Sequence, residues 1–428
     1  MSTLQGGQVG DGLCARLALS VPREVRRICE ILRAQGHGAW VVGGCVRDLL
    51  LGRPVQDWDI ATTALPQEVM SIFRKTIPTG IAHGTVSVLM GGRPHEVTTL
   101  RAEGEYLDGR RPKEVRFGVS LKEDLARRDL TINAIAFDPI QRELIDPFGG
   151  QEDLKRGLIR AVGNPMERFA EDGLRPLRAC RLAAVLGFTM DAETEAAIRP
   201  NLSVLAKVAI ERVVEEWRKL LRAERPSLGL KIMRRTGILG LHAPWLEAID
   251  EERFRFLLGW VDRLEGDVCL RLSALGHGLE GSALGAWMKK MRFSNEEREN
   301  TLAILRAAQE IPEESALPSV RRWLGRNGIK AAKKAIALKK GAQSDQESLF
   351  HLCALEEAIQ SVVERNEPLS IKALAIGGEA LLPLVGGKPG PKVGRLLEAL
   401  LDEVLEDPSL NTEEKLLERA KVLAKELK

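Results

Sequence analysis

Two aspartates, Asp57 and Asp59, stand two positions apart in the segment DWDI. In a β-strand alternate side chains share a face, so we expect both carboxylates on one face while Trp58 and Ile60 point into the core. Adjacent carboxylates repel each other, and a cation that prefers oxygen ligands, such as Mg²⁺, relieves the repulsion. With Glu96 from a later strand, the three acids would form a two-metal site for phosphoryl or nucleotidyl transfer. The alternative is a solvated edge strand that carries two acids by chance.

A glycine pair lies just upstream of these aspartates. Gly43 and Gly44 follow the strand-like run AWVV and precede an expected helix that carries Arg47. Glycine lets the backbone come close to a phosphate, and a helix N-terminus offers N–H donors and the positive end of its dipole. This arrangement is consistent with a triphosphate site, although a Gly-Gly sequence is more often an ordinary turn.

The segment RRDLTINA (127–134) combines two arginines with polar side chains. Arg128 and its neighbour could clamp a triphosphate through charge-assisted hydrogen bonds, with Asp129 or Asn133 bonding to a ribose hydroxyl. The alternative is a surface ion pair that contributes little to stability. The segment alone does not decide between the two.

A third charged segment, at 171–181, is expected to be helical. Asp172 and Arg175 are three positions apart, which makes them neighbours on one helix face, and a salt bridge is the simpler interpretation. Arg178 and Arg181 extend the row of cations beyond what that bridge needs. The row is therefore a candidate nucleotide-binding surface.

The elements that must position these residues change character along the chain. Between about 36 and 150 short β-like runs alternate with turns, and a hairpin turning at 91–94 is expected. Beyond about residue 150 the pattern is helical, with proline and glycine between the helices. The sequence thus predicts an α/β head on a long helical body. The expected strands are 39–42, 85–90, 96–100 and 132–137, and the clearest helix carries Leu396, Leu397, Leu400, Leu401, Val404 and Leu405.

Composition limits the classes of protein that fit. The 428 residues, of which 44% are hydrophobic and 29% charged, suggest about two to four compact units with real cores. Only 4% are aromatic, which argues against an extended base-stacking platform. No apolar run could cross a bilayer and no secretory signal is visible. The six cysteines are scattered without a CxxC pair, so we expect no zinc site, no disulfides and a cytoplasmic location.

The charge balance requires any nucleic-acid surface to arise from local segregation. The net charge is +3, from 63 basic and 60 acidic residues. Residues 321–340 contain eight cations and no acid, which predicts contact with RNA phosphates; the alternative is a solvated helix face. The candidate RNA-binding residues are Arg321, Arg322, Lys330, Lys333 and Lys334.

Together and in this order, these segments resemble the class II tRNA nucleotidyltransferases, the CCA-adding enzymes of bacteria and eukaryotes, and the related bacterial poly(A) polymerases. The resemblance covers nearly the whole chain and is most specific in the head. The motifs are GGCVRD (43–48), LLG (50–52), DWDIAT (57–62), HGTVSV (83–88), EVTTLR (96–101), RRDLTINA (127–134), IDPFGGQEDL (145–154), ERFAEDGLRPLRACRLAAVLGF (167–188) and GPKVGRLLEALLDEVLEDP (390–408).

The resemblance implies an α+β fold: a polymerase-beta-like nucleotidyltransferase head with a mixed sheet at 1–158, a base-recognising helical neck at 159–225, and a tRNA-binding helical body and tail at 226–428. It implies template-independent addition of C and A to the 3′ end of tRNA from CTP and ATP. The implied mechanism is attack of the 3′-hydroxyl on the α-phosphate, with two Mg²⁺ ions and release of pyrophosphate.

The resemblance also implies a role for each matching position. Asp57 and Asp59 match the metal-binding carboxylates, and Glu96 matches the third acid. Asp172 and Arg175 match the pair that reads the base: a carboxylate accepts from the exocyclic amine that C and A share, and G or U would leave buried polar groups unpaired. The implied nucleotide-binding positions are Gly43, Gly44, Arg47, Arg128, Asp129, Asn133, Asp172, Arg175, Arg178 and Arg181.

Three relatives of the CCA-adding activity compete with it. Residues 101–117 resemble the flexible loop of enzymes that can add A, although Glu103 stands where relatives often have Asp. Residues 79–86 look like those of the tRNA enzymes, which disfavours a poly(A) polymerase. An enzyme that adds only A remains an alternative, and a non-catalytic tRNA-binding protein is disfavoured by the three acids. No His-Asp dipeptide occurs, so an HD phosphohydrolase domain is not expected.

Overall fold

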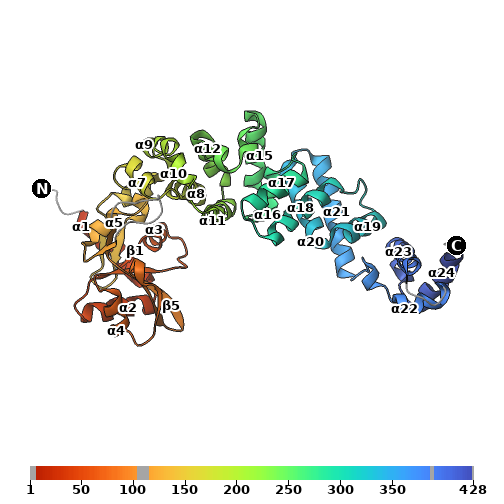
Figure 1. Cartoon of the computed structure of the whole chain (residues 1–428), viewed down its shortest axis with the longest axis horizontal. Coiled ribbons are helices and arrows are strands. Elements are labelled where there is room, and N and C mark those ends of the chain that lie inside the picture. Colours follow the sequence, from red (N-terminus) through yellow and green to blue (C-terminus); the bar gives the residue numbers. More distant parts are fainter. Residues whose placement is uncertain (1–5, 104–114, 386–389, 427–428) are drawn as a thin grey trace. The chain divides into compact units, whose positions relative to one another are not determined.

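The computed structural model describes residues 6–103, 115–385 and 390–426. The chain divides into two compact units, Met1–Ile249 and Asp250–Lys428, and Figure 1 labels many of their elements. The predicted boundaries at 158 and 225 both lie inside the first unit, so the three-part division stays a prediction. Within the described ranges, no helix is long and apolar enough to span a membrane.

A seven-stranded sheet forms the centre of the first unit, in the strand order β3-β4-β5-β2-β1-β8-β9. β2 and β5 run parallel, whereas the other neighbours are antiparallel, so the predicted mixed sheet is confirmed. Its strands are β1 (Ala39–Val42), β2 (Asp59–Thr62), β3 (Thr76–Gly80), β4 (Thr85–Met90), β5 (Arg93–Thr99), β8 (Ala136–Asp138) and β9 (Glu143–Ile145). Two small sheets pair β6 (Arg101–Glu103) with β7 (Val115–Phe117), and β10 (Leu158–Ile159) with β11 (Thr189–Met190).

The strands that carry the site are held by helices packed on the sheet (Figure 1). α2 presents Val25, Ile28, Cys29 and Leu32 at helical spacing, all fully buried, and packs on β1 and β2. The predicted hairpin is present: β4 and β5 pair up to Met90 and Arg93 around two glycines with positive φ. The helices of this region are α1 (Gly6–Ser20), α2 (Arg23–Ala34), α3 (Gly44–Leu50), α4 (Pro66–Ile72), α5 (Leu121–Ala126) and α6 (Gly150–Arg156), with the 3₁₀ turns η1 (Ile81–His83) and η2 (Thr131–Asn133).

Two of the expected strands are wrong in part. The segment 132–137 begins as the 3₁₀ turn η2, because Asn133 donates to Asp129 and Thr131 bonds to Asp153; only its end joins β8. β2 begins at Asp59, so Asp57 and Trp58 precede the strand and Trp58 is half-buried at a cavity wall, not in the core. The short strands β10 and β11 also extend the β structure beyond residue 150.

Helices complete the first unit. α8 begins with Pro176 in its first turn, ends at Gly187 in the left-handed conformation, and packs on α11 and α12. The expected helix across 171–181 is interrupted, because Asp172 lies in the turn between α7 and α8. The helices are α7 (Pro165–Glu171), α8 (Arg175–Leu186), α9 (Ala192–Ala196), α10 (Leu202–Leu205), α11 (Ile210–Leu221), α12 (Pro226–Thr236), α13 (Ile238–His242) and α14 (Pro244–Glu247), with the 3₁₀ turn η3 (Arg199–Asn201).

The described part of the second unit is helical. α23 confirms the predicted apolar stripe: Leu396, Leu400 and Val404 are fully buried in a cluster that α22 and α24 help to form. The helices are α15 (Glu251–Arg263), α16 (Val268–Leu275), α17 (Gly281–Lys290), α18 (Asn295–Gln309), α19 (Leu317–Asn327), α20 (Ile329–Ala342), α21 (Gln346–Glu364), α22 (Gly378–Leu381), α23 (Pro391–Glu406) and α24 (Glu413–Glu426), with the 3₁₀ turns η4 (Ile371–Ala373), η5 (Leu382–Val385) and η6 (Pro408–Leu410).

Candidate active site

The turn between β1 and α3 brings the backbone against an arginine. Gly43 has φ 80° and ψ −133°, a conformation that residues with a side chain rarely adopt. A Cβ atom at this position would lie 2.6 Å from Nη1 of Arg128, so the absent side chain also makes room for the guanidinium. Gly44 follows as the first residue of α3, close to Arg47. The predicted glycine turn therefore exists, and two of the predicted arginines lie against it.

A cavity of about 580 Å³ opens beside this turn. Its wall combines residues of α3, the segment 127–133 and the helices α8 and α11, all within the first unit. Eight arginines and three aspartates line it, which gives it a strongly positive character suited to a polyanion such as a triphosphate. These residues are Arg47, Arg101, Arg127, Arg128, Arg175, Arg178, Arg181, Arg212, Asp59, Asp129 and Asp172.

A hydrogen-bonded chain fixes the polar floor of the cavity. Arg47 donates from Nη1 to Oδ1 of Asn133 at 2.7 Å. Its Nε and Nη2 atoms donate to the two carboxylate oxygens of Asp48, each at 2.9 Å. Asn133 in turn donates from Nδ2 to Oδ1 of Asp129 at 3.1 Å. Both the oxygen and the nitrogen of the Asn133 side-chain amide are thus hydrogen-bonded, so Asn133 orients Arg47 and Asp129.

Asp129 is buried but remains ionised. Burial opposes its charge, yet the charge of Arg178 and hydrogen bonds from Asn133 and Arg178 hold the pKa of Asp129 well below its usual range. Nε of Arg178 donates to Oδ2 at 2.8 Å, and the Leu130 N–H donates to Oδ1 at 2.9 Å. A carboxylate accepts about four hydrogen bonds, so Oδ2 keeps capacity for a further donor such as a ribose hydroxyl.

The arginines of α8 are held by different partners. Arg178 uses Nε for Asp129, and its side chain is 37% exposed at the cavity. Arg181 donates from Nε to Glu216 of α11 at 2.5 Å, and burial lowers the pKa of Arg181 against the opposing charge of Glu216. Arg178 therefore presents its guanidinium to the cavity more openly than Arg181 does.

The predicted base-reading pair lies where α8 and α11 border the cavity. Asp172 accepts from the Leu174 N–H and from Nη2 of Arg212, each at 3.0 Å. Arg175 is buried and donates to the backbone carbonyls of Arg168 and Arg127, each at 2.9 Å. Both side chains line the cavity, and each is held in place by contacts with other parts of the first unit.

The three predicted metal ligands lie near the start of the parallel pairing between β2 and β5. Asp59 of β2 lies opposite Glu96 of β5 in the register of the sheet, and Asp57 is two residues earlier. All three are exposed and line a second cavity of about 940 Å³, so that Asp59 belongs to both cavities. Desolvation raises the pKa of Asp59, the charges of Glu96 and Asp57 add to this effect, and the charge of Arg128 opposes it.

The donor chemistry of this cluster fits a divalent cation. Carboxylate oxygens are hard ligands, and their mutual repulsion is what a cation relieves. Across the described ranges, no three acidic, histidine or cysteine side chains are close enough to form a ready-made metal site. The three carboxylates would therefore have to draw together around an ion.

Sequence reasoning missed three residues of the arginine-rich cavity. His83 and Arg101 lie within quoted motifs but were given no role, whereas Arg212 lies on α11, 40 residues beyond its partner Asp172. No local pattern distinguishes Arg212 from other cations on the outer face of an amphipathic helix. Most of the predicted loop at 101–117 lies outside the described residues.

The predicted RNA-binding stretch is largely engaged in contacts within the second unit. Arg321 is only 5% exposed, pairs with Glu367 and donates to the carbonyls of residues 405 and 406; as an RNA contact it is wrong. Arg322 pairs with Glu406, and Lys334 with Asp267 at 2.5 Å. Lys330 and Lys333 are exposed, and for them the prediction stands.

Comparisons with known proteins cover most of the chain. The family model described as "Poly A polymerase head domain" matches residues 39–160. The model "Probable RNA and SrmB- binding site of polymerase A" matches 187–255, and that of tRNA nucleotidyltransferase domain 2 matches 273–420. Together these three matches extend from residue 39 to residue 420.

Similar proteins share the whole length. The chain is 38% identical over 402 residues to the CCA-adding enzyme of Limosilactobacillus reuteri, covering 94% of this chain and 96% of that protein. It is 38% identical over 406 residues to that of Lactiplantibacillus plantarum. The crystal structure of the Bacillus stearothermophilus CCA-adding enzyme in complex with CTP aligns with a TM-score of 0.79 at 33% identity, over 94% of this chain and 98% of that one. The chain belongs to the family of CCA-adding tRNA nucleotidyltransferases.

Proposed function

We propose that this protein adds C and A to the 3′ end of tRNA from CTP and ATP, releasing pyrophosphate at each step. The observation that carries the proposal is the arginine-lined cavity, which shares Asp59 with the carboxylate cluster of β2 and β5. A nucleoside triphosphate in that cavity has its phosphates beside cations and its α-phosphate near the acids. The family relatives share this activity by name.

The triphosphate is assigned to the head side of the cavity. Arg128 lies against the Gly43 turn, and Arg47 is oriented there by Asp48 and Asn133. Fixed cations in a site shielded from water stabilise charge that accumulates on a departing pyrophosphate, because they need little reorganisation. Arg178 adds an exposed guanidinium from the neck.

The ribose and the base are assigned to Asp129 and to the neck. Oδ2 of Asp129 retains capacity to accept from a ribose hydroxyl while Arg178 holds it ionised. Asp172 would accept from the exocyclic amine of C or A, and Arg175 would donate to a ring nitrogen or carbonyl oxygen. Since contacts within the protein hold both side chains, a base with the wrong edge leaves them unpaired.

Asp57, Asp59 and Glu96 would hold the divalent metal ions, for which we propose Mg²⁺. When bound, the metal lowers the pKa of a hydroxyl and neutralises charge on phosphate oxygens. The chain supplies the three carboxylates and keeps Asp59 beside Arg128, whose charge partly offsets the repulsion among the acids. The second cavity, next to these acids, offers room for the 3′-terminal nucleotide of the acceptor.

One assay tests the proposal. Purified protein receives tRNA transcripts that end at the discriminator base or at CC, with Mg²⁺ and each nucleoside triphosphate in turn. We expect C on the shorter transcript, A on the CC end, and no extension by GTP or UTP. Incorporation of A alone would indicate an A-adding enzyme, long A tails a polymerase, and no incorporation a binding protein; each of these results would overturn the proposal.

A further inference from the structure

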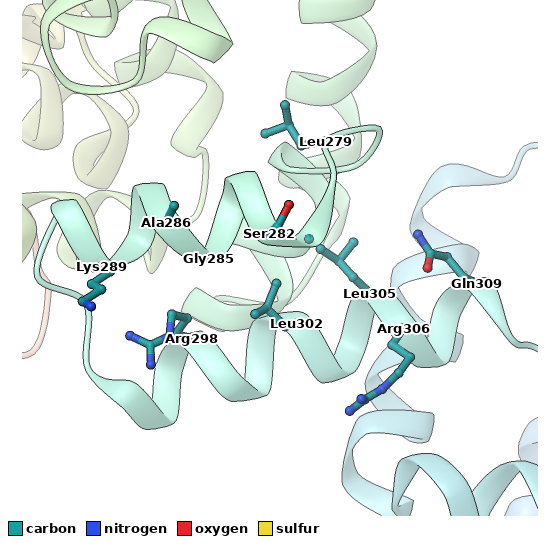
Figure 2. Close-up of a pocket in the computed structure, with 11 residues that line it drawn as sticks. Leu279, Ser282, Gly285, Ala286, Lys289, Arg298, Leu302, Leu305, Arg306 and Gln309 are labelled. Carbon is teal, nitrogen blue, oxygen red and sulfur yellow. The ribbon is translucent and has the colours of Figure 1, made fainter.

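The second unit contains a groove that the proposed function does not use. It lies between the antiparallel helices α17 and α18, with a volume of about 450 Å³ (Figure 2). The match that names RNA binding ends at residue 255, before the groove begins. Lys289 and Arg298 lie toward one end of it, and Arg306 and Gln309 toward the other (Figure 2).

Small residues on α17 create the groove. Gly281, Ser282, Gly285 and Ala286 recur on one face of the helix and line it. A Cβ at Gly285 would lie 3.3 Å from Cδ1 of Leu302 on α18, so the glycine brings the two helices together while the small neighbours leave space above them. The result is a shallow channel along the helices with backbone and small side chains at its base.

The polar residues around the groove carry one sign of charge. Lys289, Arg298 and Arg306 line it, and no acid does so. Within the described part of the chain, none of the three cations forms an ion pair, and Lys289 and Arg306 are exposed. By contrast, Arg321, Arg322 and Lys334 on the neighbouring helices are neutralised by carboxylates. In a chain of net charge +3, such a one-signed groove is local segregation of charge.

The spacing of the cations favours a long anion over a small one. Arg298 and Arg306 are eight residues apart on one helix, which places their Cα atoms roughly 12 Å apart along the axis at about 1.5 Å per residue. Since the two side chains lie toward opposite ends of the groove (Figure 2), separate anionic groups fit them better than one phosphate or carboxylate. A sugar-phosphate backbone presents successive charges along its length and can satisfy the two together.

We infer that the groove between α17 and α18 binds the sugar-phosphate backbone of the substrate tRNA, with Lys289, Arg298 and Arg306 contacting phosphates. The inference rests on the proposed function for the identity of the RNA. The small residues of α17 let the backbone approach the helix closely, and Gln309 adds a neutral hydrogen-bond donor. Binding of this kind is independent of sequence and sensitive to salt.

Two triple variants with the same change in net charge test the inference. K289Q/R298Q/R306Q removes the groove cations, whereas K290Q/K372Q/K421Q removes three exposed cations of the second unit that do not line the groove. Binding of a tRNA transcript lacking CCA is measured by fluorescence anisotropy between about 0.05 and 0.3 M salt. We expect the groove variant to lose at least about 30-fold in affinity at 0.1 M salt and the slope of log K against log[salt] to fall by about 2 to 3. The second variant should stay within about threefold of wild type.

A second pair of variants tests whether the space in the groove is needed, without changing the net charge. Ala286→Gln places a larger neutral side chain in the groove, and Ala283→Gln places the same side chain on an exposed position of α17 outside it. We expect weaker tRNA binding, by about fivefold or more, only for Ala286→Gln. Equal losses in the two triple variants, a larger loss in K290Q/K372Q/K421Q, or unchanged binding by Ala286→Gln would each overturn the groove assignment.

Affinity is measured without nucleotide, so this result is independent of catalysis. If wild type binds tRNA through the groove and yet adds no nucleotide, the proposed function fails and the groove inference survives.

Discussion

Replacing Gly43 with alanine should damage the protein in two separable ways, whereas the same change at Gly44 should not. Gly43 has φ 80° and ψ −133°, and forcing a residue with a side chain into such a conformation costs about 1–3 kcal/mol. Gly44 is the first residue of α3, where a Cβ would meet only Nη2 of Arg47 at an ordinary 3.5 Å. Alanine is the better helix former by about 0.5–1 kcal/mol, so Gly44→Ala should be neutral or slightly stabilising.

The cost at Gly43 can be measured locally. The chain has two units, so a single unfolding transition is not assured, and hydrogen–deuterium exchange of peptides covering 39–48 reports on the head alone. A loss of about 1–3 kcal/mol in local stability raises the exchange rate of these amides by roughly 5- to 150-fold. Peptides from the second unit, such as those of α23, serve as the internal control.

The second effect is on catalysis. The new Cβ would lie 2.6 Å from Nη1 of Arg128, so the guanidinium must move away from the turn. Loss of one charged hydrogen bond to the triphosphate corresponds to about 1.5–3 kcal/mol, and we expect kcat/KM for CTP to fall by about 10- to 100-fold. Unchanged exchange at 39–48 in Gly43→Ala, or an equal increase in Gly44→Ala, would refute the backbone argument. Normal kcat/KM in a destabilised Gly43→Ala would refute the role of Arg128.

Three further predictions concern the carboxylates. Asp59 has a raised pKa, so its ionised form destabilises the folded state above that pKa, and the penalty is relieved as the pH falls. Asp59→Asn should therefore abolish nucleotide addition, yet slow the hydrogen–deuterium exchange of peptides covering β2 at neutral pH without metal. Faster exchange of these peptides would contradict this. For the same reason protons should compete with Mg²⁺ at Asp59 at a higher pH than at an ordinary aspartate, whose pKa is about 3.9. As the pH falls, the Mg²⁺ concentration for half-maximal rate should therefore begin to rise above the pH range in which an ordinary aspartate titrates. A rise confined to that ordinary range would exclude the effect. Arg212 donates to Asp172 at 3.0 Å, so Arg212→Met should reduce the ratio of kcat/KM for CTP over UTP by roughly tenfold, equivalent to about 1.4 kcal/mol of discrimination. Recovery of the ratio in Arg212→Lys would show that the charge matters. An unchanged ratio in Arg212→Met would remove Arg212 from base selection.

Residues close together in sequence could be placed from the sequence because local geometry dominates there. The turn at Gly43 follows from two glycines after an apolar strand, and the hairpin at Gly91 and Gly92 follows from the same reasoning. Asp59 and Glu96 were expected on neighbouring strands, and the parallel register places them directly opposite each other. In these cases backbone preference and the tertiary contacts favour the same answer.

Prediction failed where a distant residue decides the local conformation. The segment 132–137 has the apolar character of a strand, but Asn133 bonds to Asp129 and Thr131 to Asp153, and these contacts favour a 3₁₀ turn. Asp172 was expected within a helix beside Arg175, yet it lies in a turn and pairs with Arg212 of α11. Sequence spacing describes neighbours on one element and contains no information about which side chain another helix supplies.

The cations of the second unit show the same limit most clearly. The run at 321–340 has no acid within it, so it resembles an RNA-binding face, but Glu367, Glu406 and Asp267 approach from other elements and neutralise three of its members. Lys289, Arg298 and Arg306 are spread over two helices with glutamates between them in sequence, and nonetheless they line a groove without acids. In a chain with nearly equal numbers of acids and bases, what marks a cation as available to a phosphate is therefore the absence of a carboxylate in space. The two triple variants carry the same charge change and differ in whether the replaced cations line the groove, so their comparison can separate a binding groove from a merely basic surface.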